Sequence, residues 1–356
     1  MGTLVGHVAP GFGFLVIGLW HLVNHIKLHS LRPGSYTSRP WFPTAKLRRL
    51  ELYLIILGSL ASISMELVIG PEKHQPFDDD GTIPSNHLHN FEHASISLAL
   101  LIYACFAIVF DRVNPRLRDE MTMLLAAAAF AQQLLMFHLH SADHMGVEGQ
   151  YHWLLQTVIV VSLATTLLAV ALPRSFLVSF VRSVSIAFQG VWFVVMGLVL
   201  WTPSLIPKGC FMNLEVGHMV VRCRSDEALH RAKSLVNLQF SWYTAAMAVF
   251  SMALYLWLSK VFPEEPQYLP LVKDAAREEL EEHDLESQKK LMESDSFLHM
   301  GKGLRAIELE RCLFFLMEEL LCGLNLYSKS GVSVTSYYND ICFRLPSKRL
   351  WSKFVQ

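Results

Sequence analysis

Seven long apolar runs, almost free of Asp, Glu, Lys and Arg, constrain this chain more than any other feature of its sequence. They cover residues 5–23, 52–70, 93–110, 121–140, 152–172, 183–201 and 235–258. As a helix rising about 1.5 Å per residue, each run is long enough to cross roughly 30 Å of hydrocarbon. Because a helix satisfies its own backbone hydrogen bonds in lipid, the runs predict an all-α, polytopic membrane bundle of about seven transmembrane helices.

The composition excludes several classes of protein. Charged residues make up 17% of the chain and hydrophobic residues 52%, whereas an average soluble protein has about 25% charged residues. An ordinary soluble enzyme is therefore excluded. The net charge of −1 gives no basic excess for nucleic acid, so the lipid bilayer is the predicted partner. No phosphate-binding glycine loop, dinucleotide-binding motif or nucleophile elbow occurs in the sequence.

Basic residues alternate between the predicted loops, and this alternation predicts orientation. Lys and Arg gather in the first, third and fifth loops, whereas the second loop is acidic and the fourth has neither Lys nor Arg. The odd-numbered loops are therefore expected in the cytosol, with the N-terminus lumenal or extracellular and the C-terminus cytosolic. The sixth loop disagrees with this arrangement, since it carries Lys208, Arg222, Arg224, Arg231 and Lys233.

The composition divides the chain into a transmembrane domain and a polar tail. Residues 1–260 form the predicted seven-helix domain, and residues 261–296 form an acidic cytosolic tail that is expected to be partly disordered. Residues 297–356 form a C-terminal extension of open status, within which residues 307–327 fit an amphipathic helix. In the sixth loop, Cys210 and Cys223 fall on the predicted oxidising side, so a disulfide and two unpaired thiols both remain open.

Most of the 16 histidines fall near the predicted outer ends of the spans. Imidazole and carboxylate are ligands that suit zinc, copper or non-haem iron, so a transition metal such as zinc is one expectation. A proton relay or structural polar network is the other, beside histidines that only contact the interface. The candidate metal ligands, here called the outer histidine cluster, are His89, His93, His138, His140 and His152. Secondary candidates are Glu66, Glu92, Asp143, His144 and Glu148.

The histidines also form two local patterns in the sequence. His89 and His93, with Glu92 between them, spell H-x-x-E-H, a pattern found in some zinc hydrolases. A second stripe, His21, His25 and His29, repeats every four residues near the cytosolic side. A lone helical stripe of this kind is predicted to be a snorkelling or capping face rather than a site. The glutamines inside the spans are expected to form hydrogen bonds between helices.

Four blocks of the sequence resemble the transmembrane protein 45 family of multi-pass membrane proteins, whose biochemical function is unknown. They are GHVAPGFGFLVIGLW from Gly6, HLHNFEHASISLALL from His87, QQLLMFHLHSADHMGVEGQYHWLL from Gln132 and FQGVWFVVMGLVLW from Phe188. The resemblance covers about residues 1–260. Its most specific element matches His138, His140 and His152. Glu148 falls at a position where the family has an acidic residue, and His89 falls where the family tends to carry a histidine. Glu92 and His93 are not part of that pattern, which speaks against the hydrolase motif.

Three functions follow as hypotheses. The leading hypothesis is a membrane protein whose outer histidine cluster binds a transition metal or relays protons, in transport, sensing or structural organisation. The second is a membrane-embedded metal hydrolase or lipid-modifying enzyme, with Glu92 or Glu66 as the general base beside a metal-bound water. The third is a non-catalytic scaffold. Whether the protein is an enzyme stays open, and no catalytic residue is assigned.

Overall fold

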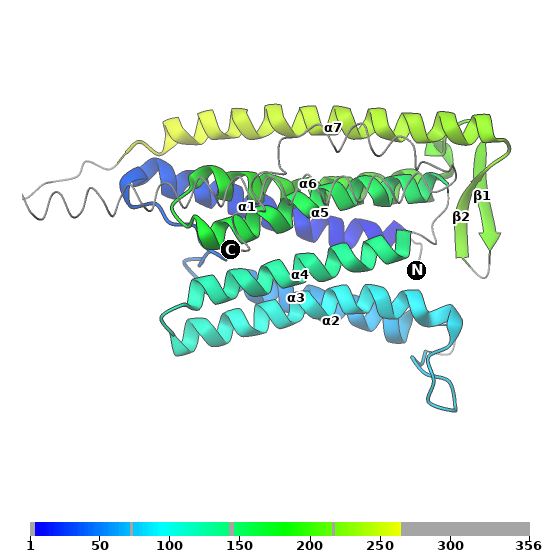
Figure 1. Cartoon of the computed structure of the whole chain (residues 1–356), viewed down its shortest axis with the longest axis horizontal. Coiled ribbons are helices and arrows are strands. Elements are labelled where there is room, and N and C mark those ends of the chain that lie inside the picture. The colour runs from blue at the N-terminus through cyan, green and yellow to red at the C-terminus, as the bar shows by residue number, and fades with distance from the viewer. Residues whose placement is uncertain (1–3, 72–73, 142–145, 216–217, 265–356) are drawn as a thin grey trace, which may run out of the picture. The chain divides into compact units, whose positions relative to one another are not determined.

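The computed structural model describes residues 4–71, 74–141, 146–215 and 218–264. Within these ranges, seven helices are long and apolar enough to cross a membrane, which confirms the predicted all-α membrane bundle (Figure 1). They are α1 (Leu4–Leu31), α2 (Leu50–Ser64), α3 (Leu88–Val113), α4 (Arg118–Ser141), α5 (Val147–Ala171), α6 (Phe176–Trp201) and α7 (Asp226–Val261). A π-helical turn, η2 (Met65–Ile69), continues α2. The predicted tail and extension lie almost wholly outside the described residues.

The helices pack as a series, and α6 is the most deeply buried of them. α1 packs along α6, α6 against α5, α5 against α4, α4 against α3, and α3 against α2. In the most apolar stretch of α6, 72% of the residues are buried inside the protein, whereas in the most apolar stretch of α7 only 11% are buried. α7 therefore exposes most of its apolar surface, as a helix in contact with lipid does. The largest core lies among α4, α5, α6 and α7, around Trp192, Tyr151 and Met196.

Short polar residues determine where several helices begin and end. The Ser175 and Ser225 side chains cap the starts of α6 and α7 by accepting hydrogen bonds from the backbone N–H groups of Val178 and Ala228. Asn114 ends α3 in the left-handed conformation, with φ of 54°, which asparagine tolerates better than most residues. The helices extend beyond the apolar runs because the polar residues at their ends continue the helical hydrogen bonds.

Glycines let α1 and α6 approach until their backbones touch. A Cβ atom added at Gly18 would lie 2.2 Å from the Ala187 nitrogen, and one at Gly190 would lie 2.2 Å from the Leu15 nitrogen. Small residues at such crossings are the usual means of close helix packing in lipid, where no hydrophobic effect drives helices together. The two helices run antiparallel, so the second half of α1 lies beside the first half of α6.

A two-stranded antiparallel hairpin, β1 (Cys210–Glu215) and β2 (His218–Cys223), precedes α7, where the sequence predicted only a loop. Cys210 and Cys223 are directly opposite in register, and the structure joins them in a disulfide. Arg222 pairs with the Glu215 carboxylate. Hydrogen bonds from Arg222 and Asn213 lower the pKa of Glu215 to about 2. These covalent and ionic links hold the hairpin closed.

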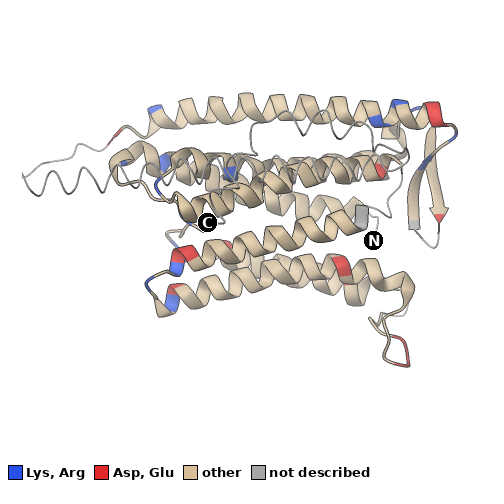
Figure 2. Cartoon of the chain, viewed as in Figure 1, with Lys and Arg blue, Asp and Glu red and all other residues tan. Residues whose placement is uncertain are grey.

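Charged residues gather towards the two ends of the helices, whose central parts are largely uncharged (Figure 2). We call the end that carries the hairpin and the start of α1 the hairpin end. The opposite end, with the connections between α1 and α2, α3 and α4, and α5 and α6, is called the basic end. Several ionisable side chains depart from this pattern because they are buried inside the bundle, and these define the candidate sites.

Candidate functional site

Glu66 and His93 form the first pair of ionisable groups at the hairpin end. Glu66 lies in the π-helical turn η2 and is 8% exposed. Its carboxylate lies 3.3 Å from Nδ1 of His93 and accepts a 3.0 Å hydrogen bond from the Asn90 amide. π-helical turns widen a helix and occur often at functional sites. The arrangement joins α2 to α3 through a buried carboxylate.

His152 and Glu148 lie one turn apart on α5 and are both buried. Nδ1 of His152 lies 3.0 Å from the backbone oxygen of Glu148, so it donates a hydrogen bond to that oxygen. The ring of His7, from α1, lies 5.9 Å from the ring of His152 between centroids and stacks on Trp201 at 4.5 Å. Side chains of α5 and α6 thus contact the buried imidazole of His7 from α1.

His138 of α4 is joined to α5 through an amide. Its Nδ1 lies 3.2 Å from Oε1 of Gln156, whose Nε2 donates to the backbone oxygen of Phe137. Because the Gln156 oxygen can only accept, His138 carries a proton on Nδ1. Gln156 is fully buried, and its amide therefore fixes the tautomer of a histidine on the neighbouring helix.

The described members of the outer histidine cluster contact several different partners. His89 and His93 lie one turn apart on α3 with ring centroids 6.4 Å apart, while His138 and His152 contact other partners. Among the residues that the structure describes, no group of three or more His, Cys, Asp or Glu could hold a metal ion. The side chain of His140, and Asp143 and His144 entirely, lie outside that description.

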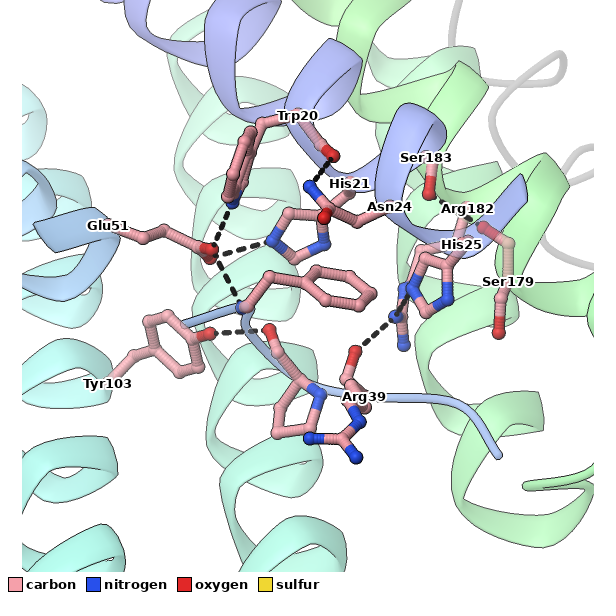
Figure 3. A network of polar contacts seen from close by, with 12 residues as sticks. Trp20, His21, Asn24, His25, Arg39, Glu51, Tyr103, Ser179, Arg182 and Ser183 are labelled. Carbon is pink, nitrogen blue, oxygen red and sulfur yellow. Dashed lines mark hydrogen bonds and ion pairs between the residues drawn. The ribbon is translucent and has the colours of Figure 1, made fainter. Parts of the chain in front are cut away.

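A second network, which we call the inner network, lies towards the basic end, around the carboxylate of Glu51 on α2. Glu51 is 5% exposed. Its oxygens accept hydrogen bonds from Nε1 of Trp20 at 3.1 Å, Nε2 of His21 at 2.6 Å and the backbone N–H of Phe42 at 2.9 Å (Figure 3). Three donors from two segments therefore converge on one buried carboxylate.

Arg182 of α6, which is 2% exposed, continues the inner network. Its guanidinium donates to Nε2 of His25 at 3.1 Å and to the backbone oxygen of Arg39 at 2.8 Å (Figure 3). A guanidinium has only donors, so Nε2 of His25 accepts and the ring proton of a neutral His25 is on Nδ1. Nδ1 lies 2.8 Å from the Tyr36 hydroxyl and donates to it. Burial raises the pKa of Tyr36 to about 12, so the phenol stays protonated.

The inner network also holds the connection between α1 and α2 in place. The Ser38 hydroxyl lies 2.8 Å from the Ser179 hydroxyl, and the backbone N–H of Ser38 donates to the Pro173 oxygen at 2.6 Å. Tyr103 of α3 donates to the Pro40 oxygen at 3.0 Å. Residues 36–42 are therefore attached to α3, α6 and the connection between α5 and α6. Buried backbone groups of a loop need such partners because water does not reach them.

The prediction that the stripe His21, His25 and His29 forms a snorkelling or capping face is wrong for its first two members. α1 continues to Leu31, eight residues beyond its apolar run, and His21 and His25 are 4% and 0% exposed. Arg182, which the sequence assigned to a loop, lies inside α6. The sequence contained two signals of these buried contacts. Glu51 and Arg182 each lie directly before an apolar run, where an ionisable group needs a partner.

A row of hydroxyl and amide groups lies between the inner network and the hairpin end. The Ser162 hydroxyl of α5 donates to the Ser185 hydroxyl of α6 at 2.8 Å, and Nε2 of Gln189 donates to Ser162 at 2.7 Å. Ser185 in turn donates to the backbone oxygen of Arg182. The expected interhelical role of Gln189 is confirmed, and Gln239 has the same role through Tyr151 at 2.6 Å. Polar side chains therefore occur at several depths between α5 and α6.

The fold and its buried polar groups are those of a multi-pass membrane protein, with seven apolar helices within the ranges that the structure describes. Residues 119–256 match the model of a family described as "Family of unknown function (DUF716)". The matched region runs from the start of α4 almost to the end of α7, and it contains His138, His152 and Arg182. The region similar to that family therefore contains the histidines of α4 and α5 and Arg182 of the inner network, whereas the pair Glu66 and His93 and the residues His21, His25 and Glu51 lie outside it.

Proposed function

We propose that this membrane protein relays protons through buried imidazole and carboxylate groups, in a transport or sensing role. The observation that carries the proposal is the contact between His21 and Glu51, 2.6 Å apart and almost fully buried. Ionisable side chains inside membrane helices are costly, and they commonly mark proton or ion pathways. Histidine is the side chain whose charge changes most readily near physiological pH, so it suits proton transfer.

The geometry of His21 supports this reaction. Nε2 faces the Glu51 carboxylate, while Nδ1 is buried with no hydrogen-bond partner among the described residues. A proton taken up at Nδ1 would give an imidazolium that can release its Nε2 proton to Glu51. His25 follows one helical turn later, and the centroids of the His21 and His25 rings are 6.1 Å apart. The hydrogen bonds of His25 with Tyr36 and Arg182 extend the chain of polar groups.

We propose further that the basic end faces the cytosol, with the N-terminus lumenal or extracellular and the C-terminus cytosolic. The Lys and Arg residues of the first, third and fifth connections support this orientation. The sequence blocks described above also support membership of the transmembrane protein 45 family. Under this orientation the inner network lies on the cytosolic side and the outer histidine cluster on the opposite side.

Proton flux into liposomes tests the proposal. Full-length protein is reconstituted into vesicles that contain the pH dye pyranine, and a potassium diffusion potential drives protons inward. Wild-type protein is expected to acidify the lumen faster than empty vesicles, and Glu51→Gln and His21→Gln are each expected to abolish the difference. The control is His29→Gln, because His29 stacks on Phe176 and lies outside the Glu51 contacts. Equal flux in wild type and both variants would refute the relay.

Metal binding at the hairpin end is the second candidate. The approach of His7 to His152, with ring centroids 5.9 Å apart, favours it because imidazoles from two helices meet there. Elemental analysis of purified wild-type protein and of a variant with His89, His93, His140 and His152 replaced by Ala tests this candidate. Near-stoichiometric zinc, copper or iron in the wild type alone would support a metal site. Equal trace metal in both proteins would count against it.

A further inference from the structure

A polar pocket and an apolar groove adjoin between α3 and α4 at the basic end. The polar pocket has a volume of about 40 Å³, and its lining includes Arg39, Arg48 and Arg118. The apolar groove has a volume of about 270 Å³ and is lined by Phe106, Phe110, Met121, Leu124 and Leu125. Phe110 lines both of them. The two features therefore adjoin at Phe110, and one is polar whereas the other is apolar.

The polar pocket has more positive than negative charge. Its acidic members are Asp111 and Asp119. Asp111 is bound by Arg48 at 2.7 Å and also by Arg49 at 2.7 Å, so two guanidinium groups share one carboxylate. The side chain of Arg48 is 63% exposed and remains accessible from outside. Arg118 in turn lies 3.2 Å from Asp119. The three arginines of the lining exceed its two carboxylates by one positive charge, which favours an approaching anion.

The inner network positions one wall of this pocket. The backbone oxygen of Arg39 accepts a hydrogen bond from the buried Arg182, and the oxygen of Pro40 accepts one from Tyr103. Both residues line the pocket. Because their backbone is tied to α6 and α3, the Arg39 side chain starts from a defined position at the pocket. A preorganised site loses less entropy on binding than a mobile one.

The order of the two features along the helices matches the order of groups in a bilayer lipid. α3 ends at Val113 and α4 begins at Arg118, so the charged residues lie at the helix ends. Phe106 lies one turn before Phe110, about 6 Å deeper along the helix, and Leu125 lies about 10 Å beyond Arg118. Phe106 is 48% exposed and Leu124 is 43% exposed. The groove is thus open on the side that faces lipid.

We propose that this surface binds one anionic phospholipid, with its phosphate at the arginines and an acyl chain in the groove. The charges select a negatively charged headgroup, as basic pockets between membrane helices do. The groove selects a lipid over a soluble phosphate compound, because only a lipid has an apolar chain to place against Phe106 and Leu124. The inner network holds the Arg39 backbone in place, but the lipid proposal does not rest on proton transfer through His21 and Glu51.

Native mass spectrometry of the full-length protein in detergent tests the site. The protein is titrated with dioleoyl phosphatidic acid, with dioleoyl phosphatidylcholine and, as a soluble phosphate, with glycerol 3-phosphate. One phosphatidic acid is expected to bind at least tenfold more tightly than phosphatidylcholine. Glycerol 3-phosphate is expected to compete weakly or not at all.

Two variants alter the two parts of the site separately. Arg39→Gln combined with Arg118→Gln removes two positive charges while keeping the Arg39 backbone oxygen, and is expected to weaken phosphatidic acid binding about tenfold or more. Leu124→Trp fills the groove and is expected to weaken binding without changing charge. The matched controls are Arg116→Gln, in the same connection but not lining the pocket, and Leu256→Trp on the exposed face of α7.

The outcomes separate the proposal from its rivals. Replacing Arg39 and Arg118 together by Lys, which keeps the charge, is expected to retain binding, and this variant also reports on folding. Equal losses in Arg116→Gln and in the double Gln variant would show general attraction to a basic surface and overturn the site. Binding of glycerol 3-phosphate as tight as that of the lipid, with Leu124→Trp unaffected, would overturn a lipid in favour of a soluble phosphate ligand.

Discussion

Replacing Gly18 by alanine is expected to force α1 away from α6. The new Cβ would lie 2.2 Å from the nitrogen, 2.5 Å from the Cα and 2.8 Å from the Cβ of Ala187. The first two of these atoms are backbone and cannot rotate aside. The helices must therefore separate, or the α1 backbone must bend.

The size of the effect follows from two opposing contributions. Overpacking a close contact costs about 1–3 kcal/mol, while alanine gains about 1 kcal/mol over glycine as a helix former. We expect the upper part of the first range because the obstacle is backbone, which leaves a net loss of about 2 kcal/mol. Gly13→Ala is the matched control on the same helix, since its Cβ would meet no atom within 4 Å. It should stabilise the protein by about 0.5–1 kcal/mol.

Unfolding in mixed micelles of dodecyl maltoside and increasing SDS, followed by tryptophan fluorescence, measures both variants. The separation should also lengthen the 3.1 Å contact between His25 of α1 and Arg182 of α6, so Gly18→Ala should lower proton flux in the liposome assay while Gly13→Ala does not. If Gly18→Ala is as stable as Gly13→Ala, the close approach of the two helices is refuted.

Three further perturbations test other parts of the structure. Glu51→Leu leaves three buried donors without an acceptor and is expected to cost about 3 kcal/mol or more in the same SDS titration; a loss below about 1 kcal/mol would contradict its role. Replacing Cys210 and Cys223 by Ser should destabilise the hairpin by about 2–3 kcal/mol, seen as faster proteolysis there, and alkylation of both cysteines without reductant would disprove the bridge. Because Arg222 lowers the pKa of Glu215 to about 2, the carboxylate stabilises the hairpin above pH of about 4.5 and loses this effect as the pH falls towards 2. Hydrogen exchange in the hairpin should show that loss, and Glu215→Gln should remove the pH dependence.

The sequence was sufficient to predict the apolar helical segments and the class of protein. The transfer of each segment from water to lipid depends on its own residues, so a run of apolar residues predicts a span without knowledge of its neighbours. The ends of the helices were predicted less well. α7 begins at Asp226, nine residues before its apolar run, because Ser225 caps a turn that also contains Glu227. A hydropathy pattern does not detect such a polar first turn.

Contacts of the histidines with segments distant in the chain could not be predicted from spacing. The outer histidine cluster takes its candidate ligands from α3, α4 and α5, which are neighbours in the bundle. In the structure, His93 contacts Glu66 from α2, and His152 contacts His7 from α1. Helix order in the bundle decides these contacts, and the chain order of helices does not specify it.

The sequence by itself determined that the described part of this chain has seven segments long and apolar enough to cross a membrane, because the free energy of burying each segment in lipid is local to that segment. Only the tertiary structure decided which ionisable groups meet inside the bundle. His25 and Arg182 are 157 residues apart, yet they lie within hydrogen-bond distance because glycines bring α1 and α6 into backbone contact. Such a contact depends on how the surfaces of two helices pack together, so it cannot be predicted from the residues that flank either His25 or Arg182 in the sequence.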